Sequence, residues 1–323
     1  MNMKLTTHSL LLLAVLLAAC GAPPAATELP APEVDLVAAP TDTADLSITL
    51  NDGLNRVVTL AAPAQRVISL APSNTEILFA IGAGDQVVGR DDPSDFPEQA
   101  TAIPSVGDTF AGLNTETIVN LQPDLVLAAE ITPVEYITEL EQLGITVFWM
   151  ANPDTLEGLY INLGIVGQLT GHVNEADALV QTMQSRVIAV RDALADVTEK
   201  PTVFYELDAS DPNAPWTSGA GTFIDILITE AGGQNAGSVV TGEFAQMSIE
   251  DLLVQNPDVI LLGDAAYGVT VESVGLRAGW GQLAAVQNGQ VYPFNDSLVS
   301  RPGPRLIDAL EQLAVLLHPD QFN

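Results

Sequence analysis

The chain has 323 residues, and its 10 lysines and arginines against 41 aspartates and glutamates give a formal net charge of −31 at pH 7. A chain this acidic is repelled by nucleic acid, and no basic patch interleaved with aromatic residues offsets the repulsion, so nucleic-acid binding is excluded. The single cysteine, Cys20, excludes a disulfide framework and a thiolate metal site.

The N-terminus has the pattern of a lipoprotein signal. Lys4 precedes an apolar run over residues 10–19 that is too short to cross a bilayer, and the run ends in Leu-Ala-Ala-Cys-Gly. Small residues before a cysteine suit a signal peptidase, and Cys20 stands where a lipid would be attached. We predict a signal peptide with a lipobox over residues 1–20 and an extracytoplasmic protein anchored to the cell membrane through Cys20. An ordinary secretory peptide with a chance cysteine is the alternative.

The segment that follows predicts a tether rather than a domain. Residues 21–45 are rich in Ala, Pro, Thr and acidic residues, without the periodicity of a helix or a strand, so we expect them to be disordered. The remainder exceeds a usual single domain of ~150 residues, which predicts two lobes with separate cores. The expected divisions are an N-terminal α/β lobe at 46–152, linker helices at 153–200 and a C-terminal α/β lobe at 201–323.

The first lobe begins with alternation typical of strands at 47–60, interrupted by Asn-Asp-Gly, which predicts a hairpin. Short apolar runs predict strands, and periodic segments between them predict helices, the first of which we expect to open with a capping box at Ser73-Asn74-Thr75-Glu76. Strands that alternate with helices imply a parallel sheet covered on both faces. The strands are expected at 66–70, 87–89, 125–128 and 146–149, and the helices at 73–81, 115–121 and 133–143.

The linker is predicted to be helical from residue 153 to 197, with a break at Gly171. Its second part, 174–197, carries apolar residues at helical spacing and would span ~36 Å at 1.5 Å per residue. This length exceeds what a compact domain needs, so we expect a spine helix that joins two lobes.

The second half repeats the first. Residues 114–127 align with 248–261 at a constant spacing of 134 positions, and the alignment matches a Glu, a Pro-Asp pair and an apolar strand. The predicted fold class is therefore α/β, with two Rossmann-like lobes, each with a parallel sheet, joined by the spine helix. Strands are expected at 202–206, 259–262 and 291–293, and helices at 222–230, 248–255 and 302–317.

The repeat places Glu116 and Glu250 in the first turns of equivalent helices. A carboxylate there is stabilised by the helix N-terminus by ~0.3 to 1 kcal/mol, so a role in capping is one interpretation.

A second interpretation comes from an ordered set of motifs that covers nearly all of the chain after the signal. The set resembles the iron-siderophore and vitamin B12 binding protein family of ABC importers, most of all its cobalamin-binding members. The motifs are R-V-I-S-L-A-P-S-N-T-E-I-L at 66–78, G-A-G-D-Q-V-V-G at 82–89, D-D-P-S-D-F-P at 91–97, the two Glu-containing segments, S-G-A-G-T-F-I at 218–224 with A-G-G-Q-N at 231–235, and R-P-G-P-R at 301–305.

The resemblance implies a class III solute-binding protein, with a permease homodimer and its ATPase subunits as partners. In that family, matching glutamates on the two lobes form salt bridges with arginines on the two permease subunits. The resemblance therefore implies that Glu116 and Glu250 dock the protein, and an exposed acidic pair would steer and orient the encounter.

The ligand is expected in the cleft between the lobes, at the loops that follow the carboxyl ends of the strands. Trp216, in a polar loop where no periodicity would bury it, is the strongest aromatic candidate, and Phe96 is next; any of the aromatics could instead belong to the rim or the core. The candidate ligand-binding residues are Ser73, Asn74, Asp92, Phe96, Phe110, Trp149, Trp216, Tyr267 and Arg301.

The composition of these loops favours a large neutral cargo. Arg301 is the one arginine expected to face the cleft, which disfavours an anionic ferric siderophore, and it could equally anchor a loop. Haem binders usually offer Tyr or His to the iron, and here only Tyr267 and Tyr205 are placed to do so. Cobalamin is therefore favoured, with a ferric siderophore or haem as the alternatives, and we expect no resident cofactor or metal.

Two other classes of protein are alternatives. An envelope enzyme is disfavoured, because no G-x-S-x-G elbow, His-x-x-x-His pair, P-loop or dinucleotide motif occurs, and no catalytic residue is assigned. An envelope sensor that uses the same two-lobed fold stays open, although retention of both glutamates argues against it.

Overall fold

The computed structural model describes residues 46–322. The predicted signal peptide, Cys20 and the predicted tether lie outside the described residues. Residues 46–322 form one compact unit. Within residues 46–322, no helix is long and apolar enough to cross a membrane.

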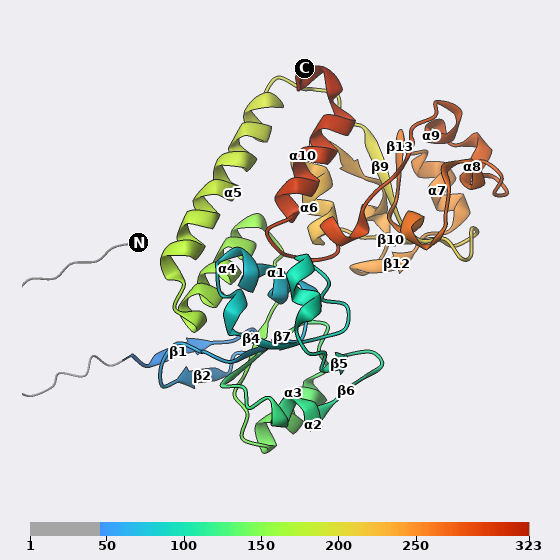
Figure 1. Ribbon diagram of the computed structural model, residues 1–323. Helices are drawn as coiled ribbons and strands as arrows, with labels where there is room; N and C mark the ends of the chain where they lie inside the picture. Colours follow the sequence, from blue (N-terminus) through green and yellow to red (C-terminus); the bar gives the residue numbers. More distant parts are fainter. Residues whose placement is uncertain (1–45, 323) are drawn as a thin grey trace, which may run out of the picture. The chain divides into compact units, whose positions relative to one another are not determined.

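The first lobe is built on a four-stranded parallel sheet in the order β4-β3-β7-β8 (Figure 1). The predicted hairpin forms ahead of it, and each predicted strand and helix of this lobe is present within a few residues. A small hairpin, β5–β6, was not predicted. The elements are β1 (Ile48–Asn51), β2 (Val57–Leu60), β3 (Val67–Ser69), α1 (Pro72–Ala80), β4 (Val87–Arg90), β5 (Gly107–Asp108), β6 (Gly112–Leu113), α2 (Thr115–Asn120), β7 (Leu125–Ala129), α3 (Val134–Gln142) and β8 (Val147–Met150).

The start of α1 differs from the prediction. The helix begins at Pro72, and the N-cap residue Ala71 has no side chain able to cap it, so the predicted capping box is wrong. Pro72 suits the first helical position because its φ is preset and its missing N–H would have had no partner there. Glu76 is thereby free of a capping role, and its carboxylate is buried against Arg305 of the other lobe.

Two helices connect the lobes, α4 (Leu156–Thr170) and α5 (Val173–Ala193). Gly171, with φ +80°, ends α4 in the left-handed conformation that favours glycine, which confirms the predicted break. The spine helix α5 has 21 residues and so is ~32 Å long. It ends at Ala193 rather than at residue 197, and residues 194–196 form turns.

The second lobe has a six-stranded sheet that combines the predicted parallel strands with an antiparallel extension. β9, β13 and β14 run parallel, and β11 also pairs parallel with β9. On the edge of β9 that faces away from β13, β10 and then β12 add two antiparallel strands. The helix expected from 302 begins only at Leu306, because prolines at 302 and 304 disfavour helical backbone before them. The elements are β9 (Thr202–Asp208), β10 (Trp216–Ser218), α6 (Phe223–Glu230), β11 (Gln234–Asn235), β12 (Phe244–Gln246), α7 (Ile249–Gln255), β13 (Val259–Leu262), α8 (Val271–Val274), α9 (Ala284–Gln287), β14 (Val291–Pro293) and α10 (Leu306–Leu317).

The sequence repeat is also a repeat of local structure. Gln122 and Asn256 occupy matching positions after α2 and α7, and both have left-handed backbone, with φ +49° and +42°. Two residues further on, Asp124 accepts backbone N–H bonds from the two residues before β3, and Asp258 accepts one from Thr202 at the start of β9, at 2.8 to 3.0 Å. The constant spacing of the repeat therefore corresponds to the same connection from helix to strand in both lobes.

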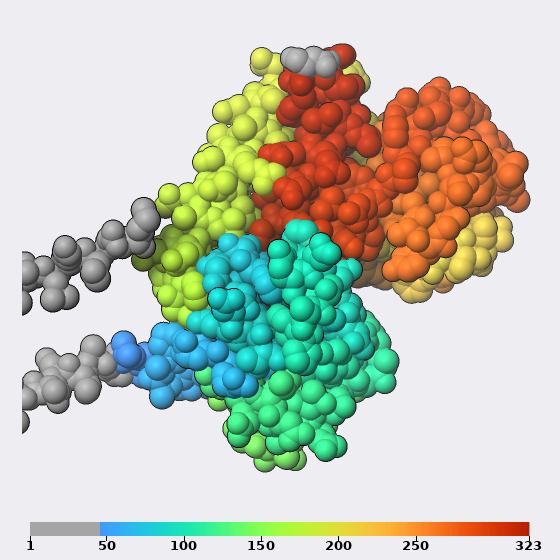
Figure 2. All heavy atoms as spheres, viewed as in Figure 1, coloured from blue at the N-terminus to red at the C-terminus, as the bar shows by residue number. Residues whose placement is uncertain are grey.

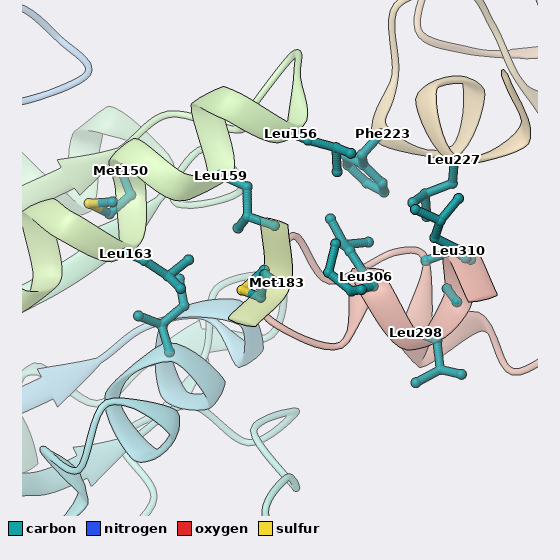
Figure 3. Packing of buried hydrophobic residues seen from close by; sticks show 14 of the residues in the cluster. Met150, Leu156, Leu159, Leu163, Met183, Phe223, Leu227, Leu298, Leu306 and Leu310 are labelled. Atoms are coloured by element: carbon teal, nitrogen blue, oxygen red, sulfur yellow. The ribbon is translucent and has the colours of Figure 1, made fainter. Parts of the chain in front are cut away.

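The largest apolar core continues from one lobe into the other. It includes residues of the first sheet, of α4 and α5, and of α6 and α10. Figure 3 shows Leu159 of α4 and Leu306 of α10 in the same packed region as Phe223 of α6. Moving the lobes apart would expose part of this cluster at a cost of ~25 cal/mol per Å² of apolar surface.

Candidate functional site

A cavity of about 320 Å³ lies between the two lobes. From the first lobe it is lined by the start of α1, the segments after β4 and β7, and the tip of the β5–β6 hairpin. From the second lobe it is lined by the start of α6, by β12 and by residues 300–302. The loops that follow the carboxyl ends of parallel strands thus supply the first wall, as expected for an open α/β sheet.

Much of the cavity wall is apolar. Phe110, at the hairpin tip, is 82% exposed, and Ile131 and Phe244 are exposed by 43% and 41%. Phe223 is buried beneath Phe244, with ring centroids 6.2 Å apart. Exposed aromatic side chains that face a cavity offer packing surface for an apolar or flat ligand.

The polar residues of the first-lobe wall include one carboxylate, Asp91, beside Ser73, Thr109 and Asn152. Asp91 is only 1% exposed and accepts a hydrogen bond from the Ser94 hydroxyl. Burial raises the pKa of Asp91 to about 6, because the bond from Ser94 offsets only part of the desolvation. The cavity therefore contains a carboxylate that is costly to keep ionised.

Arg301, on the second-lobe wall, is held by carboxylates of the first lobe. Its guanidinium lies 2.5 Å from Asp95 Oδ1 and 3.6 Å from Glu76 Oε1. Next to it, Arg305 binds both oxygens of Glu76, at 2.9 and 2.5 Å, and its guanidinium stacks 3.9 Å from the ring centre of Phe96. Figure 2 shows the C-terminal segment in red packed directly on the blue-green first lobe in this view. These ion pairs join the lobes beside the cavity.

Three of the nine residues predicted to bind ligand line the cavity: Ser73, Phe110 and Arg301. Asn74 is buried and donates to the carbonyls of Leu127 and Ala128, so it ties α1 to β7.

Three further candidates of the first lobe lie outside the cavity lining. Asp92 accepts a hydrogen bond from Ser105 at its surface position. Phe96 lies under Arg305, and Trp149 is 8% exposed within an apolar cluster of the first lobe. Their surroundings are those of loop and core residues.

The remaining candidates belong to the second lobe. Trp216 is half-exposed on β10, paired between β9 and β12, and Tyr267 is 87% exposed at the end of a short 3-10 helix. Neither lines the cavity. Tyr205 is buried, and its hydroxyl donates to Asp296 at 2.8 Å, so it is not available as an axial ligand. Within residues 46–322, no group of three or more His, Cys, Asp or Glu could hold a metal ion.

The sequence interpretation missed Asp91, Phe223 and Phe244. In the structure Val87, Gly89 and Asp91 are buried and alternate with more exposed neighbours, so Asp91 continues the inward face of β4. The sequence V-V-G-R-D-D itself does not distinguish Asp91 from Asp92. Phe223 follows the N-cap Thr222 directly, and a residue at the start of a helix after a strand can face a cleft. Phe244 had no such signal because β12 itself has only three residues.

Glu116 and Glu250 occupy equivalent places on α2 and α7. Each is the second residue of its helix and is exposed. The helix ends are already capped, because Asn114 accepts from the N–H of Thr117 at 2.9 Å and Ser248 accepts from the N–H of Asp251 at 3.1 Å. The two glutamates are therefore not needed as caps and are available to a partner.

Comparison with known proteins gives consistent results. A family model described as "Periplasmic binding protein" matches residues 67–298. The uncharacterized ABC transporter substrate-binding lipoprotein YvrC of Bacillus subtilis is 34% identical over 320 residues, which are 98% of this chain and 97% of the relative.

Two solved structures share the fold but are named for different ligands. The periplasmic vitamin B12 binding protein BtuF of Vibrio cholerae has a TM-score of 0.68 and 30% identity, over 81% of this chain and 99% of its own. The periplasmic heme-binding protein RhuT from Roseiflexus sp. RS-1 has a TM-score of 0.71 and 28% identity, over 80% of this chain and 99% of its own. Since the two likenesses are nearly equal, backbone similarity does not select a ligand, and side chains must decide.

Proposed function

Because the chain belongs to the periplasmic binding protein family, we propose that it captures a bulky solute between its lobes and delivers it to the permease of an ABC importer. One relative is named an ABC transporter substrate-binding lipoprotein, and a solved relative is named a periplasmic vitamin B12 binding protein. The observation that carries the proposal is a cavity built by both lobes, on a chain whose two lobes each present an exposed glutamate at the same helical position.

Cobalamin is the proposed cargo. The cavity offers exposed aromatic and aliphatic surface, and its one arginine is already paired. This combination suits a large ligand whose periphery carries neutral amides, which can donate to Asp91 and Ser73. A corrinoid is larger than about 320 Å³, so part of it would remain outside the cavity or the lobes would separate slightly to admit it.

Haem is the second candidate, because a haem-binding protein shares the fold at nearly equal similarity. Against it, Tyr205 is engaged by Asp296 and Tyr267 lies away from the cavity lining. No uncommitted cation lines the described cavity. This disfavours an anionic ferric siderophore, and it also disfavours haem, whose propionates are anionic.

Transport also requires that the protein is held at the membrane and docks on the permease. Lipid on Cys20 would hold the protein at the outer face of the cell membrane. Glu116 and Glu250 would meet arginines on the two subunits of a permease homodimer, so that a two-lobed protein with a repeated face matches a two-fold partner. The ATPase subunits would act on the permease from the cytoplasmic side.

The test is binding by the full chain purified in detergent, with cyanocobalamin, haem and a ferric catecholate siderophore as probes. We expect saturable one-to-one binding of cyanocobalamin in calorimetry, checked by absorbance. Binding of haem or the siderophore alone would reject the cargo but retain the transport role. Failure of all three probes, together with capture of a receptor rather than a permease, would favour a sensor.

A further inference from the structure

The one arginine that lines the described cavity is paired with a carboxylate of the same chain. Arg301 is the only arginine or lysine among the described residues that line the cavity. Its guanidinium contacts Asp95 at 2.5 Å and the Pro93 carbonyl at 3.4 Å, both in the loop after β4. An incoming anion would have to compete with these bonds for the same N–H groups.

The neighbouring charges do not restore a positive potential. Glu76 is 2% exposed at its side chain, and both of its oxygens are bound by Arg305. Glu76 and Asp95 together carry two negative charges, which match those of Arg301 and Arg305. Asp91 on the cavity wall adds a further carboxylate. The site as a whole is therefore neutral to negative.

The two carboxylates that face Arg301 have different roles. Glu76 is buried and joins the lobes through Arg305, whereas the side chain of Asp95 is 64% exposed at the rim. Burial tends to raise the pKa of Asp95, but hydrogen bonding from Arg301 and the positive charges of Arg301 and Arg305 outweigh it, so the pKa is lowered and Asp95 is ionised at neutral pH. Asp95 thus neutralises Arg301 without supporting the core.

We propose that Asp95 is a selectivity residue that acts through Arg301: by occupying this guanidinium it makes the cavity reject anionic ligands and admit neutral ones. This inference rests on the proposed function only in taking the cavity as the ligand site. Asp95 is a positioning residue, since it is not among the residues that line the cavity. Removing its charge leaves the Arg301 guanidinium without a carboxylate of its own, because Arg305 already compensates Glu76 and Asp91 makes no bond to Arg301.

The other arginines of residues 46–322 show the same pattern of commitment. Arg66 and Arg90 donate to backbone carbonyls, and Arg277 is buried against Glu206 at 2.5 Å. Arg56, Arg186 and Arg191 are paired with carboxylates outside the cavity. No arginine in this part of the chain is therefore spare to replace Arg301 as an anion receptor.

The test compares three forms of the full chain in detergent: wild type, Asp95→Asn, and Asp95→Asn with Arg301→Gln. The probes are haem and a ferric tris-catecholate siderophore as anions, and cyanocobalamin as the neutral ligand. We expect Asp95→Asn to bind the anionic probes about tenfold more tightly, with a gain that shrinks at high salt, and to change cyanocobalamin affinity by less than about threefold. The double variant should lose the gain.

Glu98→Gln is the matched control, because it removes the same charge from an exposed position three residues further along. It should bind every probe as the wild type does. Equal anion affinity in Asp95→Asn and Glu98→Gln, or a gain that survives Arg301→Gln, would overturn the inference. Asp95→Ser provides a second exposed variant should Asp95→Asn express poorly.

The outcomes separate this inference from the proposed cargo. If no form binds cyanocobalamin but Asp95→Asn gains affinity for the anionic probes, the cargo is wrong and the selectivity role stands. If the wild type binds cyanocobalamin and Asp95→Asn gains nothing, the cargo stands and the selectivity role is wrong.

Discussion

The two lobes are alike where they present their glutamates and unlike where they face each other. Glu116 and Glu250, with their capping residues and the left-handed residues that end α2 and α7, repeat position by position. The cavity walls share no such correspondence: the first lobe supplies Asp91 and the tip of a small hairpin, and the second supplies Phe244 on an antiparallel strand. If the duplicated face docks on a two-fold permease, as proposed, it has to stay duplicated, whereas walls that enclose one asymmetric ligand are free to diverge.

The duplicated face carries the largest expected effect. In the proposed complex the permease covers both glutamates, and loss of one partner in a buried, hydrogen-bonded charge pair costs ~2–5 kcal/mol, or roughly 30-fold or more at each lobe. Replacing Glu116 and Glu250 together by Ala should therefore abolish uptake. Ligand affinity should stay unchanged, because both side chains are exposed and outside the cavity lining. Uptake of labelled ligand in cells, with calorimetry on the purified variant, measures the two effects separately.

Glu135→Ala is the control for this comparison, since Glu135 is also the exposed second residue of a helix, α3, but has no repeat partner. It should leave uptake unaffected. Normal uptake by the double variant would remove the docking assignment, and a large effect from one glutamate alone would show that the lobes dock unequally.

The inter-lobe ion pairs carry the second effect. Glu76→Gln should lower the free energy of unfolding by about 3 kcal/mol, because it removes the buried carboxylate of the pair and leaves the largely buried Arg305 without a full counter-charge. The matched exposed pair is Arg191 with Glu230, at 2.7 Å, where Glu230→Gln should cost no more than about 1 kcal/mol. Urea unfolding of both variants measures the difference. Equal losses would mean that the lobes are held by the shared apolar core alone.

Asp91 gives a third, pH-dependent effect on the first-lobe wall. Burial raises the pKa of this carboxyl to about 6 from 3.8, so the folded state holds the proton after the unfolded state has lost it. Stability from this group is therefore highest below pH 4, falls as the pH rises from about 4 to 6, and is constant above. At ~1.4 kcal/mol per pKa unit, ionised Asp91 lowers the free energy of unfolding at pH 7.5 by about 3 kcal/mol.

Asp91→Asn should therefore be more stable than the wild type at pH 7.5, and the difference should vanish near pH 4. Thermal unfolding at both pH values checks this, with Asp92→Asn as the exposed neighbouring control. A difference between Asp91→Asn and wild type that does not change with pH would show that hydrogen bonding to Ser94, rather than charge burial, governs the site.

Sequence patterns predicted the regular elements well because their periodicity is local. The parallel strands, the break at Gly171 and the repeat of Glu116 in Glu250 all depend on spacing within short windows, and the structure contains them. The strands β10 and β12 were not predicted, since β10 follows a polar loop that gives no strand pattern and β12 exists through pairing with β10, on the far side of α6 in the sequence. The inter-lobe bonds of Glu76 escaped for the same reason, because its partner Arg305 is 229 positions away.

The candidate site was predictable to the level of loops rather than side chains. The loops after β3, β4 and β7 were expected to face the cleft, and they supply Ser73, Asp91 and Ile131. Which residue of a loop turns inward depends on strand register, which favoured Asp91 over Asp92. Trp216 was expected in an irregular loop but stands on β10, where pairing to β9 and β12 fixes its direction.

The smallest expected effect is the loss of ligand affinity when an aromatic residue of either cavity wall is replaced by Ala. Phe110 stands 82% exposed at the tip of the first lobe's hairpin, while Phe244 is 41% exposed and supported by Phe223 beneath it. A ligand that packs on both should lose about three- to tenfold in affinity for each Phe→Ala change, and more for Phe244, because a supported ring is ordered before the ligand arrives. Leu276→Ala, 87% exposed and outside the cavity lining, is the control. Calorimetry with cyanocobalamin would show whether the loss is confined to one lobe; a loss at Phe244 alone would mean that the hairpin does not contact the ligand and that the second lobe dominates its recognition.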